Sequence, residues 1–183
     1  MNMNSFWVQV LIGALFFGYT GYFSFKSYLL NKTYKEGLEK FKESHKHIEE
    51  FSESKKWVII SSIMTLMAVL SAVFADKFDV APDQLVYYRI AYVALAIMFL
   101  GLALETNVRK RIWFSDDGFF FVDQYYRYRM IVHYNDKKSL GVFRNSEVLM
   151  ANKDKLSVSG KMADQIRERE AQWKEKKKQR KHK

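Results

Sequence analysis

Two apolar runs stand close together in the middle of the chain: Trp57–Ala75, WVIISSIMTLMAVLSAVFA, and Leu85–Leu104, LVYYRIAYVALAIMFLGLAL. The first has 19 residues and no charged side chain, and the second has 20 residues and a single charge, Arg89. A helix needs about 20 predominantly apolar residues to cross the roughly 30 Å hydrocarbon core of a bilayer. The two runs therefore predict a transmembrane hairpin joined by a short acidic loop, residues 76–84.

A third apolar run, Phe6–Phe25, lies near the start of the chain and contains no charged side chain. A secretory signal peptide has a basic start and a small-residue cleavage site after its apolar core. Here neither feature is present, and the basic residues Lys26, Lys32 and Lys35 follow the run instead. We therefore expect an uncleaved first transmembrane span.

Lysine and arginine predict the orientation of the spans, because short cytoplasmic flanks of membrane proteins are enriched in these residues. The first loop is rich in lysine, the segment after the third span opens with Arg109, Lys110 and Arg111, and the loop between the second and third spans has one lysine. The predicted layout in a bacterial plasma membrane is extracellular 1–5, span 6–25, cytoplasmic 26–56, span 57–75, extracellular 76–84, span 85–104 and cytoplasmic 105–183.

Small residues in the spans suggest where helices approach one another. Ala14 and Gly18 lie four residues apart in the first span, although glycine is common in such spans without any contact. In the second span a longer stripe of small residues recurs at helical spacing, and we expect it to pack against another span. The stripe consists of Ser61, Thr65, Ala68, Ala72 and Ala75.

The cytoplasmic segment 26–56 is highly charged, with seven lysines and six glutamates between Asn31 and Lys56. Five positions nevertheless recur at spacings of three and four: Leu38, Phe41, His45, Ile48 and Ser52. That spacing predicts one amphipathic helix, lying on the membrane surface or against the C-terminal domain. A solvated connecting helix shows the same pattern, so both interpretations remain open.

Arg89 is the one ionisable residue inside a predicted span. Intramembrane charges often mark functional sites. Arg89, however, lies about one and a half helical turns from the acidic loop, so its side chain can extend to the interface. Asp76, Asp79 and Asp83 are the candidate partners. We expect an interfacial anchor, and a functional role is the alternative.

After the third span the pattern changes from helical to alternating, which indicates β-structure. Ile112 and Phe114 precede Asp116-Asp117-Gly118, a strong hairpin signal. The further strands are expected at 119–122, 126–134, 140–143, 148–151 and 156–158, with a second turn at 135–138. Residues 105–160 therefore predict one antiparallel sheet of about five or six strands, a size usual for sheets.

A basic C-terminal helix is expected to follow at 161–183. Ser159 is placed to cap it, and Met162, Ile166 and Trp173 mark its apolar side. The expected fold is an α+β membrane protein with three transmembrane helices and a small cytoplasmic antiparallel β domain ending in this helix. Its plan is similar to that of pleckstrin-homology-like modules, a similarity of fold that carries no ligand with it.

The segment Arg111-Ile-Trp-Phe-Ser-Asp-Asp-Gly-Phe-Phe-Phe121, with Tyr128 and Ile131, resembles the YobD-type family of small bacterial three-span membrane proteins. Those proteins share the order of one span, a cytoplasmic stretch, a two-span hairpin and a strand–turn–Gly-Phe-Phe-Phe segment. This chain has a more highly charged first loop and an added basic tail. The family has no assigned activity, so the resemblance implies a multi-pass plasma-membrane location and no catalytic residues.

The sequence offers little support for catalysis. The chain has no cysteine, which excludes disulfides and thiol chemistry. His45 and His47, with Glu43, Glu49 and Glu50 nearby, form the one cluster that suggests a metal. On a helix the two histidines would point about 200° apart, whereas zinc needs three or four converging ligands. We expect a solvated charged face, no metal, no cofactor and no enzymatic activity.

The C-terminal ten residues are the most distinctive charged feature, because seven of them are lysine or arginine. Such a cluster contacts anionic lipid or the phosphates of a nucleic acid by the same electrostatic attraction. It can also be a solvated helix end that enforces the topology, and the sequence leaves these alternatives open. The candidate contact residues are Lys174, Lys176, Lys177, Lys178, Arg180, Lys181 and Lys183.

The expected function is to anchor a small cytoplasmic β domain that binds a partner or the membrane surface. Membrane lipid and a protein partner or second copy are the expected ligands, and nucleic acid is less favoured. The alternative is an insertase resembling the Oxa superfamily, with a ribosome-binding basic tail. Such an insertase needs a polar groove inside the bilayer, and the spans offer only Arg89 and a few hydroxyls.

Overall fold

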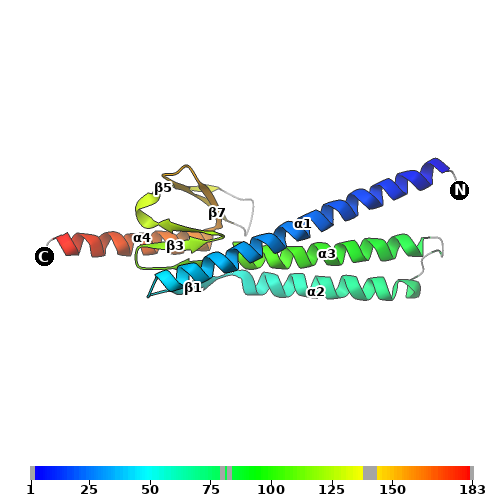
Figure 1. Ribbon diagram of the computed structural model, residues 1–183, viewed down its shortest axis with the longest axis horizontal. Helices are drawn as coiled ribbons and strands as arrows, with labels where there is room; N and C mark the ends of the chain where they lie inside the picture. Colours follow the sequence, from blue (N-terminus) through cyan, green and yellow to red (C-terminus); the bar gives the residue numbers. More distant parts are fainter. Residues whose placement is uncertain (1–2, 79–80, 82–83, 138–143, 182–183) are drawn as a thin grey trace. The chain divides into compact units, whose positions relative to one another are not determined.

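The computed structural model describes residues 3–78, 81, 84–137 and 144–181. It divides the chain into two compact units (Figure 1). Unit 1 consists of Met1–Lys32 and Ser54–Val108, and unit 2 consists of Thr33–Glu53 and Arg109–Lys183. The described residues form four α-helices and two antiparallel sheets, which confirms a mixed α and β fold.

Unit 1 is built entirely from helices. It contains the first part of α1 (Met3–Ser44), α2 (Ser54–Val73), the short 3-10 helix η1 (Ala75–Lys77) and α3 (Leu85–Arg109). Within the described residues, α2 and α3 are the two helices that are long and apolar enough to cross a membrane. Figure 1 shows them running in opposite directions, as expected for a hairpin.

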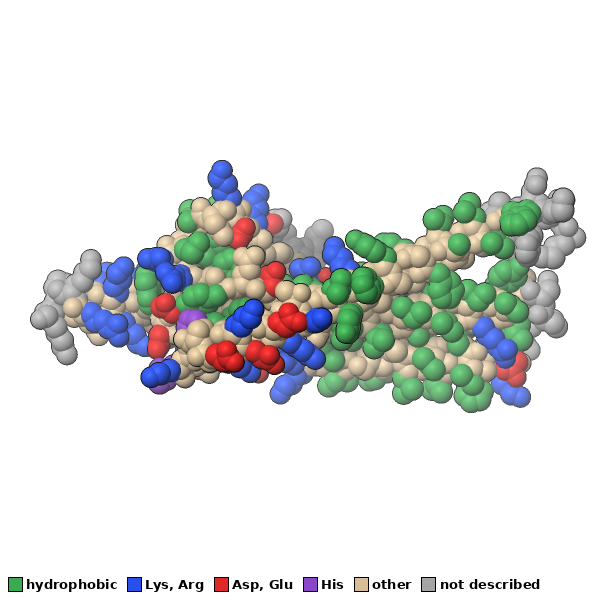
Figure 2. All heavy atoms as spheres, in the orientation of Figure 1, with side chains coloured by type: hydrophobic (Ala, Val, Ile, Leu, Met, Phe, Trp, Pro, Cys, Tyr) green, Lys and Arg blue, Asp and Glu red, His purple; other side chains and the backbone are tan. Residues whose placement is uncertain are grey.

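The large apolar side chains of unit 1 point outward. Only 6% of the apolar window of α2 and 17% of that of α3 are buried. Figure 2 shows apolar side chains spread over the visible face of these helices. A soluble helical bundle would place such side chains inside, because exposing contiguous apolar surface to water is costly.

The interior of unit 1 is formed by small residues instead, including Ala94, Gly101 and Ala103. All five residues of the predicted small stripe in α2 and η1 are buried or half-buried, which confirms that this face packs inward. The pair in α1 behaves differently. Ala14 and Gly18 are exposed, and a methyl group added to Gly18 would meet nothing within 4 Å.

Helices α1 and α3 approach closely at Gly101. The Ser24 hydroxyl on α1 donates a hydrogen bond of 2.7 Å to the backbone oxygen of Ile97 on α3. A Cβ atom on Gly101 would lie 2.7 Å from the Ser24 Oγ and 3.0 Å from the Ser24 Cα. Glycine at this position therefore allows the two backbones to come together, as small residues do between membrane helices.

Replacing Gly101 by alanine should destabilise unit 1, because the added methyl group must displace the backbone at Ser24. Overpacking of this kind costs about 1–3 kcal/mol, against a helix-propensity gain of up to about 1 kcal/mol. Gly18→Ala is the matched control, since it gains the same propensity in open space. The midpoint of thermal unfolding in detergent should be lowered by Gly101→Ala and not by Gly18→Ala. Equal midpoints for the two variants would contradict the close approach.

Unit 2 contains two antiparallel sheets followed by a helix. The four-stranded sheet has the order β1 (Glu49–Ser52), β2 (Arg111–Phe114), β3 (Gly118–Phe121) and β4 (Gln124–Arg127). A 3-10 turn, η2 (Tyr128–Met130), leads to the three-stranded sheet of β5 (Ile131–Lys137), β6 (Asn145–Met150) and β7 (Lys155–Ser159). The chain then continues into α4 (Gly160–Lys181).

Alternate side chains of both sheets form one hydrophobic core with the first turns of α4. Ile112 and Phe114 from β2 face inward, as do Val148 and Met150 from β6, in the two-residue period of a strand. The other core residues are Phe119, Phe121, Tyr126, Tyr128, Leu156, Val158, Met162, Ala163 and Ile166. The predicted apolar side of the C-terminal helix is confirmed, with Trp173 packed at the edge of this core.

All four residues of β3, Gly-Phe-Phe-Phe, are buried, because both faces of this strand are covered. Phe119 and Phe121 face the core, while Phe120 faces the last turns of α1. There the Phe120 ring stacks on Phe41, with centroids 5.5 Å apart, and lies near Tyr34. A strand that is buried on both faces needs apolar residues at successive positions, which explains why the three phenylalanines of β3 are consecutive.

Three sequence-based expectations about this region are wrong. The predicted helix across residues 31–56 ends at Ser44, and Glu49–Ser52 forms β1 paired with β2. The single sheet is two sheets, since η2 interrupts the strand expected at 126–134. The turn expected at 135–138 is still strand through residue 137, and the candidate strand 140–143 lies outside the described residues.

Replacing Phe120 by alanine should loosen α1 from the four-stranded sheet, because the ring is 2% exposed between them. Buried phenylalanine-to-alanine changes cost about 3–5 kcal/mol, so the unfolding midpoint of unit 2 should fall clearly. Val132→Ala is the comparison within the same unit, because Val132 is 62% exposed and such surface changes stay within about 0.5 kcal/mol. Similar midpoints for both variants would contradict this packing.

Candidate functional site

The basic C-terminal residues are carried by α4, whose first half is fixed to unit 2. The Ser159 hydroxyl accepts a 3.2 Å hydrogen bond from the backbone N–H of Met162, which confirms the predicted cap. The same hydroxyl donates to the carboxylate of Glu53. Met162, Ala163 and Ile166 are fully buried. The start of the helix is therefore held by its cap, by β1 and by the core.

Two arginines, one directly before β6 and one in α4, converge on Asp136 of β5. The Arg167 Nη2 lies 2.8 Å from Asp136 Oδ1, and Arg144 lies 3.0 Å from the other carboxylate oxygen. The Ser146 hydroxyl donates a 2.6 Å hydrogen bond to Asp136. These bonds, led by that from Ser146, lower the pKa of Asp136 to about 2. The network ties α4 to the three-stranded sheet.

Two further contacts continue along α4. Arg169 bonds Glu49 of β1, and this hydrogen bond lowers the pKa of Glu49. The Tyr134 hydroxyl donates a 2.9 Å hydrogen bond to Glu170. Burial, followed by this bond to a carboxylate, raises the pKa of Tyr134. The arginines of the first half of α4 are thus engaged by acidic residues of unit 2.

The second half of α4 differs because the charged side chains of residues 174–180 face solvent. We call residues 174–183 the basic segment. Lys174 forms an ion pair of 2.6 Å with Glu170, and the Lys177 ammonium lies 5.1 Å from the centre of the Trp173 ring. Side chains 174–180 are all exposed. The side chain of Lys181 and the whole of Lys183 lie outside what the structure describes.

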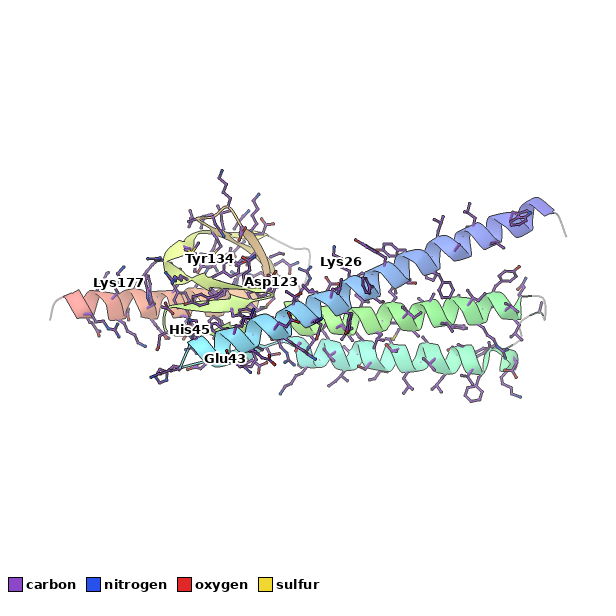
Figure 3. The ribbon with its side chains drawn as sticks, viewed as in Figure 1. Lys26, Glu43, His45, Asp123, Tyr134 and Lys177 are labelled. Atoms are coloured by element: carbon purple, nitrogen blue, oxygen red, sulfur yellow. The ribbon has the colours of Figure 1, made fainter. Side chains whose placement is uncertain are left out.

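Figure 3 labels Lys177 on the part of α4 that extends past the strands of unit 2, and Tyr134 among those strands. Contacts within unit 2 give the direction of the helix. Its first residue follows Ser159, which bonds Glu53, whereas Arg169 bonds Glu49 at the other end of β1. Because β1 spans only about 13 Å, the basic segment lies beyond the Glu49 end of the strand.

Two of the three points where unit 2 continues into unit 1 lie at the opposite end of β1. The backbone N–H of Glu53 donates a 2.9 Å hydrogen bond to Lys110, so the chain before α2 and the chain after α3 meet there. α1 enters unit 2 near Trp113, which pairs with Glu50 and donates a 2.8 Å hydrogen bond to Tyr34, and it ends beside the β2–β3 turn at Asp117. The connections at Glu53 and Lys110 are thus the two that lie at the end of β1 away from the basic segment.

The predicted solvated charged face is exposed at Glu43, His47, Glu49 and Glu50, but it is not one helical face, because α1 ends at Ser44. His45 is half-buried at the end of α1, with its ring 4.7 Å from that of Tyr125. Its Nε2 lies 4.0 Å from Asp117 Oδ1, and the Tyr125 hydroxyl donates a 2.5 Å hydrogen bond to the same oxygen. The partners come from strands more than 70 positions away, so no local pattern could reveal them.

Ser44, His45 and Asp117 do not have the geometry of a catalytic triad. In a triad the serine hydroxyl bonds one imidazole nitrogen and the carboxylate accepts from the other at hydrogen-bond distance. Here the Ser44 Oγ lies 2.9 Å from His45 Nδ1 and also bonds two backbone carbonyls of its own helix, at 2.9 and 3.0 Å. The Asp117 carboxylate, however, lies 4.0 Å from His45 Nε2, too far for the hydrogen bond that orients the imidazole of a triad. The cluster closes the end of α1 against the β2–β3 turn.

Arg89 of unit 1 pairs with Asp76, with 3.6 Å between Nη2 and Oδ1. Both side chains are about half exposed, at 48% and 46%. Of the three predicted partners, Asp76 is the one within the described residues, and Asp79 and Asp83 lie outside them. The Arg89 side chain thus reaches a carboxylate beyond the helix start, and its role as an interfacial anchor stays a prediction.

The described ranges contain no group of three or more His, Asp or Glu side chains arranged to hold a metal ion. Comparison with protein-family models, curated proteins and solved structures finds no match to the chain. The basic segment is therefore the candidate site, and its argument rests on the residues themselves.

The Asp136 network predicts a specific acid sensitivity. Because its pKa is lowered from 3.8 to about 2, Asp136 contributes stability that is present above pH 4 and lost as the pH falls towards 2. Asp136→Asn should therefore lower the unfolding midpoint at pH 6 and flatten its decline between pH 4 and 2. Asp116→Asn, at an exposed turn, is the control and should keep the parent pH profile. A parent-like profile for Asp136→Asn would contradict the network.

Proposed function

We propose that the chain is a multi-pass bacterial plasma-membrane protein that anchors a small cytoplasmic binding domain, unit 2, through three spans. The observation that carries this proposal is the outward exposure of the large apolar side chains of α2 and α3. These helices are long enough to cross a bilayer. Lipid is the medium in which such a surface is stable.

The first span is proposed at residues 6–25 of α1. This stretch carries no charged side chain, and its large apolar residues are also exposed, among them Leu11, Leu15 and Phe25. The lysine-rich segment that follows favours a cytoplasmic location for the next part of α1. Three spans would place the N-terminus outside and unit 2 in the cytoplasm.

The arrangement of unit 2 supports a binding role. Sheets of four and three antiparallel strands followed by one C-terminal helix are similar in plan to pleckstrin-homology-like modules. We infer that unit 2 is a binding module without enzymatic activity, although such a fold does not itself specify a ligand. The resemblance of Arg111–Phe121 to the YobD-type family agrees with a membrane location and remains part of the proposal.

The insertase alternative receives no comparable support. Three of the hydroxyls inside unit 1 are engaged by backbone carbonyls: Thr20 bonds Phe16, Ser24 bonds Ile97, and Ser27 bonds Phe23. Hydroxyls satisfied in this way do not line an open polar groove for a translocating segment. Binding through unit 2 is therefore the function that we favour.

Single cysteines test the layout directly, because the native chain has none. In intact cells a membrane-impermeant maleimide should label Asn4→Cys and Lys77→Cys, on the predicted outer side. Lys153→Cys, on the exposed β6–β7 turn, should react only after the membrane is permeabilised. Detergent-solubilised protein serves as the control in which all three positions react.

The labelling pattern distinguishes the possible topologies. Protection of Asn4→Cys together with labelling of Lys77→Cys would indicate two spans and reject the first. Labelling of Lys153→Cys in intact cells would place unit 2 outside and overturn the proposal.

A further inference from the structure

We propose that the basic segment, residues 174–183, binds the phosphate backbone of a nucleic acid. This inference rests on the proposed function only in that it places unit 2 in the cytoplasm. The sequence alone ranks nucleic acid below lipid for this segment. The difference between the two halves of α4, together with the lack of apolar side chains in the segment, reverses that order.

The first observation is that the cations of α4 separate into two groups. Arg167 and Arg169, in the first half, are held by Asp136 and Glu49. In the second half, Lys176, Lys178 and Arg180 are exposed, and no ion pair involves them within the described part of the chain. Cations that do not stabilise the fold remain available to a ligand.

The second observation is the distribution of these cations around the helix. Because successive helical residues are about 100° apart, Lys176, Lys177 and Lys178 point in three different directions. Lys174 and Arg180 lie four residues from Lys178 and Lys176, so they reinforce two of these directions, while Glu175 and Gln179 occupy the remaining sector. A helix with cations over about 200° of its circumference suits a groove flanked by two phosphate strands, and a major groove of duplex DNA is wide enough to admit a helix.

The composition of the basic segment argues against a lipid surface. A helix that lies on a membrane buries an apolar face among the headgroups, and residues 174–183 contain no apolar side chain.

An acidic polypeptide is a less suitable ligand. Peptide recognition by a helix normally uses apolar anchors at helical spacing, and the basic segment offers none. Nucleic acids present a far denser charge, about one phosphate per 1.7 Å of duplex axis. Seven cations within ten residues match that density.

The test uses the full-length protein in nanodiscs of phosphatidylcholine, which carry no net charge. Fluorescence anisotropy would measure binding to a labelled 24-base-pair DNA duplex and to an RNA duplex of equal length, between 50 and 200 mM salt. The logarithm of the binding constant should fall with the logarithm of salt concentration with a slope of about −5, as expected for five or six neutralised phosphates. The two duplexes distinguish DNA from RNA as the source of the phosphates.

The key variant replaces Lys176, Lys177, Lys178 and Arg180 by glutamine. It should weaken binding by at least about tenfold at 50 mM salt. It should also make the salt dependence shallower, lowering the magnitude of the slope by roughly 3–4, because four phosphate contacts are lost. The matched control removes the same charge from other exposed positions of unit 2: Lys40, Lys46, Lys153 and Lys155. The control should keep the parent slope, and both variants should keep the parent unfolding midpoint.

Equal weakening by the two variants would overturn the inference, because only net charge would then matter. Absence of nucleic-acid binding combined with binding of polyglutamate would assign the segment to an acidic protein. A spin label at Lys183→Cys that is immobilised by phosphatidylglycerol nanodiscs, and is unaffected by nucleic acid, would assign it to lipid. Cysteine labelling tests the topology separately, so failure of nucleic-acid binding leaves the membrane proposal standing.

Discussion

The pairing of β1 with β2 is the constraint on which unit 2 depends. Glu49–Ser52 precedes the helical hairpin and Arg111–Phe114 follows it, and the two strands pair in register from Glu49↔Phe114 to Ser52↔Arg111. Closing so long a segment would be entropically costly for a flexible chain. Two helices running in opposite directions reduce that cost, because they return the chain to the side from which it left. The hairpin of α2 and α3 thus favours the pairing of β1 with β2, which begins the four-stranded sheet.

The same ladder organises the electrostatics of unit 2. Glu53 and Glu49, at the two ends of β1, bond Ser159 and Arg169 and so align the first half of α4 with this strand. Acidic residues of the domain neutralise the arginines of that half. In the second half, where lysines predominate, Lys174 pairs with Glu170 and the cations from 176 to 180 are exposed. The helix therefore serves as both a structural element and a support for exposed cations.

The packing of α1 shows why one helix can belong to two environments. Near its start it exposes large apolar side chains, and near Ser24 it meets α3 through glycine and a hydroxyl bond. Its last turns cover Phe120 with aromatic rings, and Gly37 allows this approach because a side chain there would press against the Phe120 ring. In each part of α1, the surrounding residues limit the size of the side chain that fits at the contact.

The sequence by itself determined the apolar runs, the Asp-Asp-Gly hairpin, the Ser159 cap and the cationic C-terminus, because these features depend on composition and near neighbours. It did not reveal β1, whose Glu-Glu-Phe-Ser segment has no strand pattern of its own and is extended only because β2 lies beside it. Nor did it show that Arg167 and Arg169 are engaged while Lys176 and Lys178 are exposed. Only the tertiary structure decided these points, because pairing partners more than 30 positions apart are brought together by the packing of the core and not by local preference.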